Sequence, residues 1–341
     1  MTRTATPSGA TPSGAGRVGA GRVGRANAAR LAVLVQRQGA LAVLLVLCLA
    51  ASLRFDNFAT LDNGRAVLVA ASFLAVIALG QTFVILTGGI DLSVGSVFAL
   101  GGILAAYGST HNVLVAIVLP LGVCGLIGLV QGLIITRGGL EPFIVTLAGL
   151  LFARGLSLLV SDGGSTTYRV PVDSGFRELA QGSVLGVRNL IWMVLILYAI
   201  GTLLLRRTSY GPTVLAIGGQ QDAAELMGLP VTRTKLVTYT ASGLLAGFAG
   251  VLIASYISSG VTVLGVGTEL EAIAAVVLGG TLLTGGAGTV LGTLVGVLLL
   301  RVIQNVLNQV PYLNSNWQAV VSGSILLVVV VAQRYLSRAQ P

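Results

Sequence analysis

Acids and amides set inside apolar segments are the residues of this chain best suited to handle a polar solute. Between Gly80 and Leu100 the chain reads GQTFVILTGGIDLSVGSVFAL, an apolar stretch interrupted by two glycines and an acid. Lipid cannot hydrogen-bond a freed backbone, so such a break is tolerated only inside a protein bundle or beside a watery cavity. The candidate residues for lining a pathway are Asp91, Ser93, Glu269, Gln304, Asn305 and Asn308.

A second interrupted segment lies far downstream. It reads GVGTELEAIAAVVLGGTLLTGG from Gly265 to Gly286, and it is again short, flanked by glycine and acidic at its start. Paired interrupted segments at matching places in two halves are the best sequence indication of a translocation site.

Two of the acids, Asp91 and Glu271, also have a purely structural explanation. Asp91 could cap the following helix by accepting backbone N–H groups. Thr268 and Glu271 have the T-x-x-E spacing of a capping box, which favours a structural role for Glu271. Glu269 has no such explanation.

Two arginines, Arg154 and Arg301, fall within apolar segments, where a charge costs about 2.5–3.5 kcal/mol on insertion scales. Each should face the bundle interior or extend to an interface. Positions 301, 304, 305 and 308 share one helical face. This polar stripe is either pathway lining or a helix–helix contact, and the sequence leaves both open.

Several chemistries are excluded by missing motifs. The chain contains no G-x-x-x-x-G-K-[ST], so it does not bind ATP through a P-loop. It also shows no Ser-His-Asp set and no metal-ligand spacing; Cys48 and Cys124 lie in apolar segments and His111 stands alone in a short loop. We expect no enzyme activity, and no cofactor or metal bound by this chain.

The composition is that of a polytopic α-helical membrane protein. Hydrophobic residues make up 55% of the 341 positions and charged residues 9%. The formal charge of +9 reflects basic residues held on the cytoplasmic side rather than nucleic-acid binding.

Ten apolar segments are expected to cross or enter the membrane. The third and eighth are short, near 15 residues, whereas most of the others approach the roughly 20 residues that span a bilayer. The segments are approximately 36–53, 65–86, 94–108, 112–135, 142–160, 188–205, 236–258, 270–284, 288–308 and 317–336.

Charge sets the orientation. Most Arg and Lys residues fall on the side of the amino terminus when ten spans alternate, so both termini are expected in the cytoplasm. Spans two to five and seven to ten then form a possible inverted repeat, each with its short element second. Residues 1–29 repeat Ala, Gly, Arg, Ser, Thr and Pro and predict a disordered cytoplasmic tail, followed by a transmembrane domain over 30–341.

The loop from Arg206 to Lys235 is expected on the cytoplasmic side and contains one short helix at about Gln221–Met227. It is either an ordinary connector or, because it is long and mixes apolar with charged residues, a docking surface for a soluble partner.

Three motifs carry a family resemblance. GGIDLSVGS at Gly88–Ser96, AIGGQQDAAELMGLPV at Ala216–Val231 and ELEAIAAVVLGGTLLTGGAGTVLGTLVG at Glu269–Gly296 resemble the permeases of bacterial ATP-binding-cassette (ABC) sugar importers of the ribose, xylose, arabinose and galactofuranose type. The resemblance runs from about Asn57 to Leu336. GTVLGTLVGVLLLRVIQ and SNWQAVVSGSILLVVVVAQR look closest to the galactofuranose-type permeases.

The resemblance implies a multi-pass subunit of the bacterial inner membrane that translocates a sugar without catalysis of its own. A cytoplasmic ABC ATPase would bind ATP with Mg, a second permease copy or a related chain would complete the pathway, and an extracytoplasmic sugar-binding protein would deliver substrate to the outer loops 161–187 and 259–268. The ATPase would dock on Gly218, Gly219, Asp222, Glu225, Leu226, Met227 and Gly228.

Two alternatives remain at this point. A secondary transporter driven by an ion gradient would also use interrupted segments, with Asp91 or Glu269 as proton-relay acids. An ABC importer could also carry another polar solute, such as a nucleoside or a signalling furanose.

Overall fold

Helices make up nearly all the regular structure of the described residues, which in this computed structural model are 39–310 and isolated positions between 317 and 331. The tail 1–29 and most of the tenth apolar segment lie outside them. The elements are an apolar helix Gly39–Arg54, α2 Leu61–Leu86, α3 Val94–Ser109, α4 Val113–Arg137, α5 Pro142–Val160, the 3₁₀ turn η1 Asp162–Gly164, α6 Glu178–Gln181, the hairpin β1 Ser183–Val184 and β2 Val187–Arg188, α7 Asn189–Arg207, α8 Tyr210–Gly219, α9 Gln221–Leu226, α10 Val231–Ile257, α11 Thr268–Leu278 and α12 Val290–Asn308.

Helices cover nine of the ten expected apolar segments, and this confirms the all-α membrane class. Within the described residues, six helices are long and apolar enough to cross a membrane: α2, α4, α5, α7, α10 and α12. The count of ten spans therefore remains a prediction, since Gly39–Arg54 and α3 are shorter apolar helices and the last segment is outside the described range.

The eighth segment ends earlier than expected. We predicted an element to about residue 284, but α11 stops at Leu278. Gly280 has φ +87°, its N–H donates to the Val277 carbonyl at 3.0 Å, and the Thr281 N–H donates to the Val276 carbonyl at 3.2 Å. This is a Schellman turn, which uses the left-handed conformation of glycine to close a helix.

Polar caps start three of the long helices. Thr60 accepts a hydrogen bond from the Asn63 N–H before α2, Asn112 accepts one from the Val115 N–H before α4, and Thr289 accepts one from the Gly292 N–H before α12. Such caps satisfy N–H groups that have no partner within the helix.

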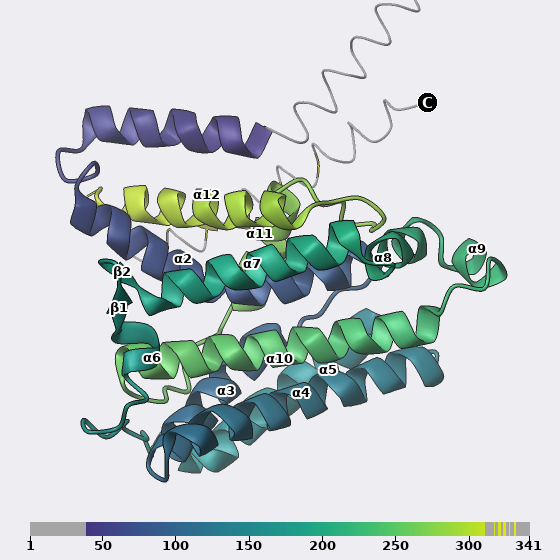
Figure 1. The fold of residues 1–341 in the computed structure, drawn as a ribbon, viewed down its shortest axis with the longest axis horizontal. Helices are drawn as coiled ribbons and strands as arrows, with labels where there is room; N and C mark the ends of the chain where they lie inside the picture. The colour runs from purple at the N-terminus through teal and green to yellow at the C-terminus, as the bar shows by residue number, and fades with distance from the viewer. Residues whose placement is uncertain are drawn as a thin grey trace, which may run out of the picture.

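The centre of the bundle is α10, which packs against α2, α3 and α4 (Figure 1). On the other side α2 packs against α11 and α12, while α3 packs against α4 as α11 does against α12. Exchanging α2–α3–α4 with α10–α11–α12 preserves these neighbours, which agrees with the inverted repeat; the repeat itself stays a prediction.

The two ends of the bundle differ. One end carries α8 and α9, and we call it the α9 end; the opposite end carries α6 with the β1–β2 hairpin, and we call it the α6 end (Figure 1). At the α6 end the Ser255 hydroxyl accepts from the Ala180 N–H at 3.1 Å and donates to the Phe176 carbonyl at 2.7 Å, which attaches α6 to α10.

Gly250 on α10 provides a test of this packing. A methyl group there would lie 2.5 Å from the Gly102 nitrogen and 2.7 Å from the Gly101 carbonyl carbon on α3. Gly250→Ala should therefore destabilise the protein by about 1–3 kcal/mol, the usual cost of overpacking. The measurement is unfolding in mixed micelles, with Gly155→Ala as control, because a methyl group at Gly155 meets no atom within 4 Å. Equal stability of the two variants would contradict the packing.

Candidate functional site

Asp91 is the centre of a buried polar cluster in the interruption between α2 and α3. Its side chain is 1% exposed. Oδ1 accepts from the Ser93 N–H at 2.9 Å and from the Ser93 hydroxyl at 2.6 Å, and Oδ2 accepts from the Ser242 hydroxyl of α10 at 2.8 Å. The carboxylate thus fixes the start of α3 to the middle of α10.

The prediction that Asp91 is itself the N-cap is wrong. The capping position is Ser93, whose side chain makes no capping bond, and Asp91 stands two residues earlier. It binds one backbone N–H, that of Ser93, and directs its other oxygen across to α10. The distance from the first helical turn explains the difference, since a cap side chain must reach the second or third helical residue.

Unused hydrogen-bonding groups flank this cluster. Among the described residues, the Gln131 Nε2 and the Tyr239 hydroxyl are buried without a partner. Tyr239 packs against Gly89 and interacts electrostatically with Asp91. Buried polar groups are ordinarily paired, so this spare capacity sets the cluster apart from the apolar packing around it.

Glu269 lies in the first turn of α11, half-buried, with its carboxylate against Gly95 in the first turn of α3. It also interacts electrostatically with Arg154 of α5. Arg154 donates to the Thr262 carbonyl at 2.7 Å, so its charge faces the protein as expected. The first turns of α3 and α11, the two short helices, therefore meet beside Arg154.

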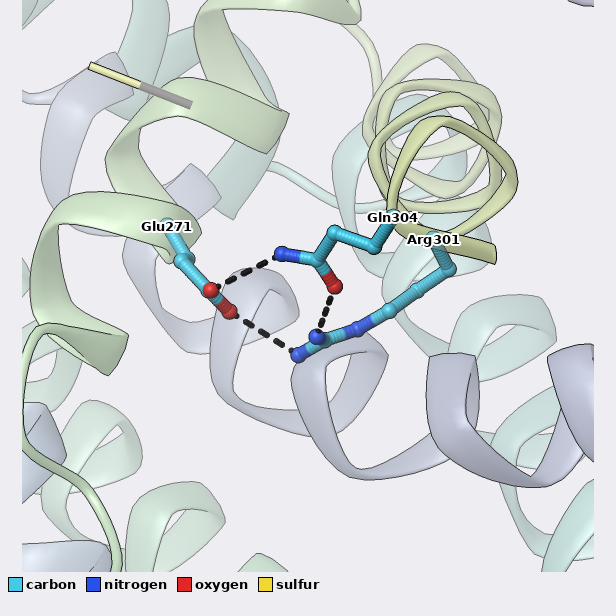
Figure 2. Close-up of polar contacts among 3 residues, drawn as sticks. All are labelled: Glu271, Arg301 and Gln304. Carbon is cyan, nitrogen blue, oxygen red and sulfur yellow. Dashed lines mark hydrogen bonds and ion pairs between the residues drawn. The ribbon is translucent and has the colours of Figure 1, made fainter. Parts of the chain in front are cut away.

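The predicted capping box at Thr268 and Glu271 is wrong. The capping residue of α11 is Gly267, without a side-chain bond, and Glu271 pairs instead with α12 (Figure 2). The Arg301 Nη2 lies 3.0 Å from the Glu271 Oε2, and the Gln304 Nε2 donates to Oε1 at 2.9 Å. Arg301 also donates to the Gln304 oxygen. An ion pair with a partner on another helix outcompetes the local cap.

Asn305 extends the polar stripe of α12 toward α2. Its Nδ2 donates to the Asn63 Oδ1 at 2.8 Å, and the Asn63 Nδ2 donates back at 3.2 Å. The contacts of Arg301, Gln304 and Asn305 are thus helix–helix contacts, one of the two alternatives for the stripe. Asn308 lies on the same face and also has an interaction partner.

The structure divides the candidate residues into two groups. In the first group, Asp91 and Ser93 share the cluster between α3 and α10, and Glu269 of α11 lies against Gly95 in the first turn of α3. The second group, Gln304, Asn305 and Asn308, lies on α12. Sequence reasoning missed Ser242 and Gln131. Gln131 is a lone amide in the apolar part of α4, and this signal was available in the sequence, whereas Ser242 is one of several polar residues of α10 and does not stand out.

The segment expected to dock a partner, Gly218–Gly228, which we call the docking segment, contains the predicted short helix and the end of one more helix. The expected helix at Gln221–Met227 is α9, and a further helix, α8, precedes it. Leu226 is 90% exposed and Met227 68% exposed at the tip. Adjacent exposed apolar side chains beyond the bundle are typical of a protein contact.

The ion pair on α11 and α12 yields a prediction. Glu271→Ala leaves Arg301 partly buried without its anion, so it should lower the free energy of unfolding by about 2 kcal/mol. The measurement is a double-mutant cycle with Arg301→Leu in mixed micelles, where the double variant should regain part of the loss. The control is Asp62→Ala, which removes the exposed pair of Asp62 with Arg65 and should change nothing measurable. Additive losses in the cycle would contradict the pair's role.

Comparisons with known proteins agree along the length of the chain. A sequence profile described as "branched-chain amino acid transport system / permease component" matches residues 65–330. The ribose import permease protein RbsC of Escherichia coli K12 is 39% identical over 87% of this chain and 93% of its own length. The L-arabinose permease protein AraH of Azospirillum brasilense is 38% identical over 89% of this chain and 88% of its own length.

The inner membrane ABC transporter permease protein YjfF of Escherichia coli K12 is 40% identical over 83% of this chain and 87% of its own length. No solved structure matches the chain. With six long apolar helices and relatives that are permeases, this is a multi-pass membrane protein. It belongs to the family of branched-chain amino acid transport system permease components.

Proposed function

We propose that the chain is the membrane-spanning permease subunit of an ATP-driven importer for a simple sugar. The observation that carries this proposal is similarity over more than four-fifths of the chain to permeases named for ribose and L-arabinose. The cargo is a pentose or hexose, or galactofuranose, toward which the carboxyl-terminal motifs point. A nucleoside or a signalling furanose is the neighbouring possibility within the same transporter class.

The proposed route passes the non-helical segments that precede the two short helices, α3 and α11. Asp91, Ser93 and Glu269 lie where α3 and α11 begin, and the α12 amides continue the polar positions. Hydroxyl, carboxylate and amide groups are suited to the hydroxyls of a sugar, because each can donate or accept a hydrogen bond. Glu269 would line the path, and Asp91 would hold the break open.

The motor is a separate chain in this proposal. The sequence has no P-loop, and α9 presents exposed apolar residues, so a cytoplasmic ATPase with ATP and Mg would bind there. In this proposal the α9 end is cytoplasmic. The distribution of positive charge supports this, because the α9 end gathers Arg137, Arg206, Arg207, Arg233 and Lys235. The α6 end would then meet a sugar-binding protein, and a second permease would complete the pathway.

Mass spectrometry of the native membrane complex in mild detergent tests this function. We expect an ATPase with cassette motifs to co-purify with the chain, and uptake in liposomes to continue when the ion gradient is collapsed while ATP is maintained. A preparation without ATPase that transports only with a gradient would replace the importer with a secondary transporter.

A variant at the tip of the docking segment gives a second prediction. Met227→Glu places a charge on a side chain that is 68% exposed, so the bundle should fold normally while ATPase co-purification and sugar uptake both fall about tenfold, as for a hot-spot residue. The matched control is Thr232→Glu, which adds the same charge at an exposed position of the α9 end outside the docking segment. Wild-type uptake and ATPase stimulation in Met227→Glu would exclude docking at this tip.

A further inference from the structure

The docking segment meets the rest of the bundle at a point where three backbone segments come together. Gly88 follows α2, Gly218 lies in the last turn of α8, and Gly285 and Gly286 lie between α11 and α12. The Gly286 N–H donates to the Leu86 carbonyl at 3.1 Å. We call these four glycines the glycine junction.

The contact in the glycine junction is backbone against backbone. A methyl group at Gly218 would lie 2.5 Å from the Gly286 nitrogen, and one at Gly285 would lie 2.7 Å from the Gly88 nitrogen and 3.0 Å from the Gly218 Cα. Gly88, Gly285 and Gly286 also have φ of +79°, +87° and +76°, which other L residues rarely adopt. No side chain separates the three segments.

The glycine junction joins elements of different exposure. On one side α8 is held in the bundle: Val214 and Ile217 are buried, and the Tyr210 hydroxyl lies 2.7 Å from the Thr238 hydroxyl of α10. Beyond it α9 projects from the bundle (Figure 1). On the other side Gly88 opens the interruption before α3, three residues from Asp91, and Gly285 and Gly286 lie in the interruption before α12.

We infer that Gly88, Gly218, Gly285 and Gly286 are positioning residues for transport, which transmit movement of the docking segment to both interrupted segments at once. Close-packed backbone transmits a displacement with little compression, because no rotamer can absorb it. The inference rests on the proposed function, since it requires an ATPase at α9.

A role of the four glycines in stability alone predicts a different result from a role in transmitting movement. If the glycines serve only stability, a substitution should lower sugar uptake and ATP hydrolysis in parallel, through loss of folded complex. If they transmit movement, the complex should still hydrolyse ATP while the sugar moved per ATP falls.

The test compares Gly218→Ala with Gly155→Ala in the co-purified complex, reconstituted in liposomes with its binding protein. The control residue, Gly155, lies on α5 outside the docking segment, and a methyl group there meets no atom within 4 Å. We expect Gly218→Ala to retain the ATPase and its hydrolysis, and to lower uptake per ATP about tenfold, within the range of coupling changes produced by single substitutions. Gly155→Ala should match the wild type.

Gly88→Asn is the second variant if Gly218→Ala does not reach the membrane. Asparagine tolerates positive φ, and the first carbon of its side chain has room, with the nearest atoms at 3.6 and 3.8 Å. We again expect lower uptake per ATP. Wild-type uptake per ATP in the folded variants, or a parallel fall of uptake and hydrolysis, would overturn the inference. Failure of the proposed function is distinguishable, because the wild-type chain would then show no ATPase or no ATP-driven uptake.

Discussion

The fold depends on satisfying backbone groups that lipid cannot satisfy. Each interruption of a helix frees N–H and C=O groups, and in a bilayer core these must find partners within the protein. In the first interruption Asp91 binds the Ser93 N–H and the Leu86 carbonyl accepts from Gly286. In the second, the Schellman turn at Gly280 closes α11 on itself. The Gly286–Leu86 hydrogen bond therefore connects the two breaks directly.

Glycine makes this arrangement possible by letting backbones approach closely. On α10 the same device brings α3 and α4 against a central helix, where Gly250 faces Gly101 and Gly247 faces Cys124. Membrane helices associate largely through such close packing, because lipid provides little hydrophobic drive between them. The glycines of this chain therefore determine which helices are neighbours, and the polar residues determine how those neighbours are held in register.

The positions of the apolar helices were predictable because each is a continuous run of apolar residues in the sequence. The break around Gly88 and Asp91 was predictable because it interrupts such a run. The partners of the polar residues were not, because Glu271 and Arg301 are 30 positions apart and only the rotation of α11 against α12 brings them together. The early end of α11 was missed because the apolar residues Leu282 and Leu283 follow Gly279 and Gly280, so the apolar segment continues past the end of the helix. For the candidate site, the sequence identified Asp91 and Ser93 but not Ser242, which lies 151 positions from Asp91.

The short length of α11 has a consequence for how the protein is made. Its 11 residues rise only about 16 Å, roughly half of the hydrocarbon thickness, and two acids occupy its first turn. Such a segment does not partition into lipid alone. The arginine that neutralises Glu271 is supplied by α12, which leaves the ribosome later. A stable position for α11 in the bilayer therefore depends on two other helices, since α12 neutralises Glu271 and the Arg154 of α5 faces Glu269.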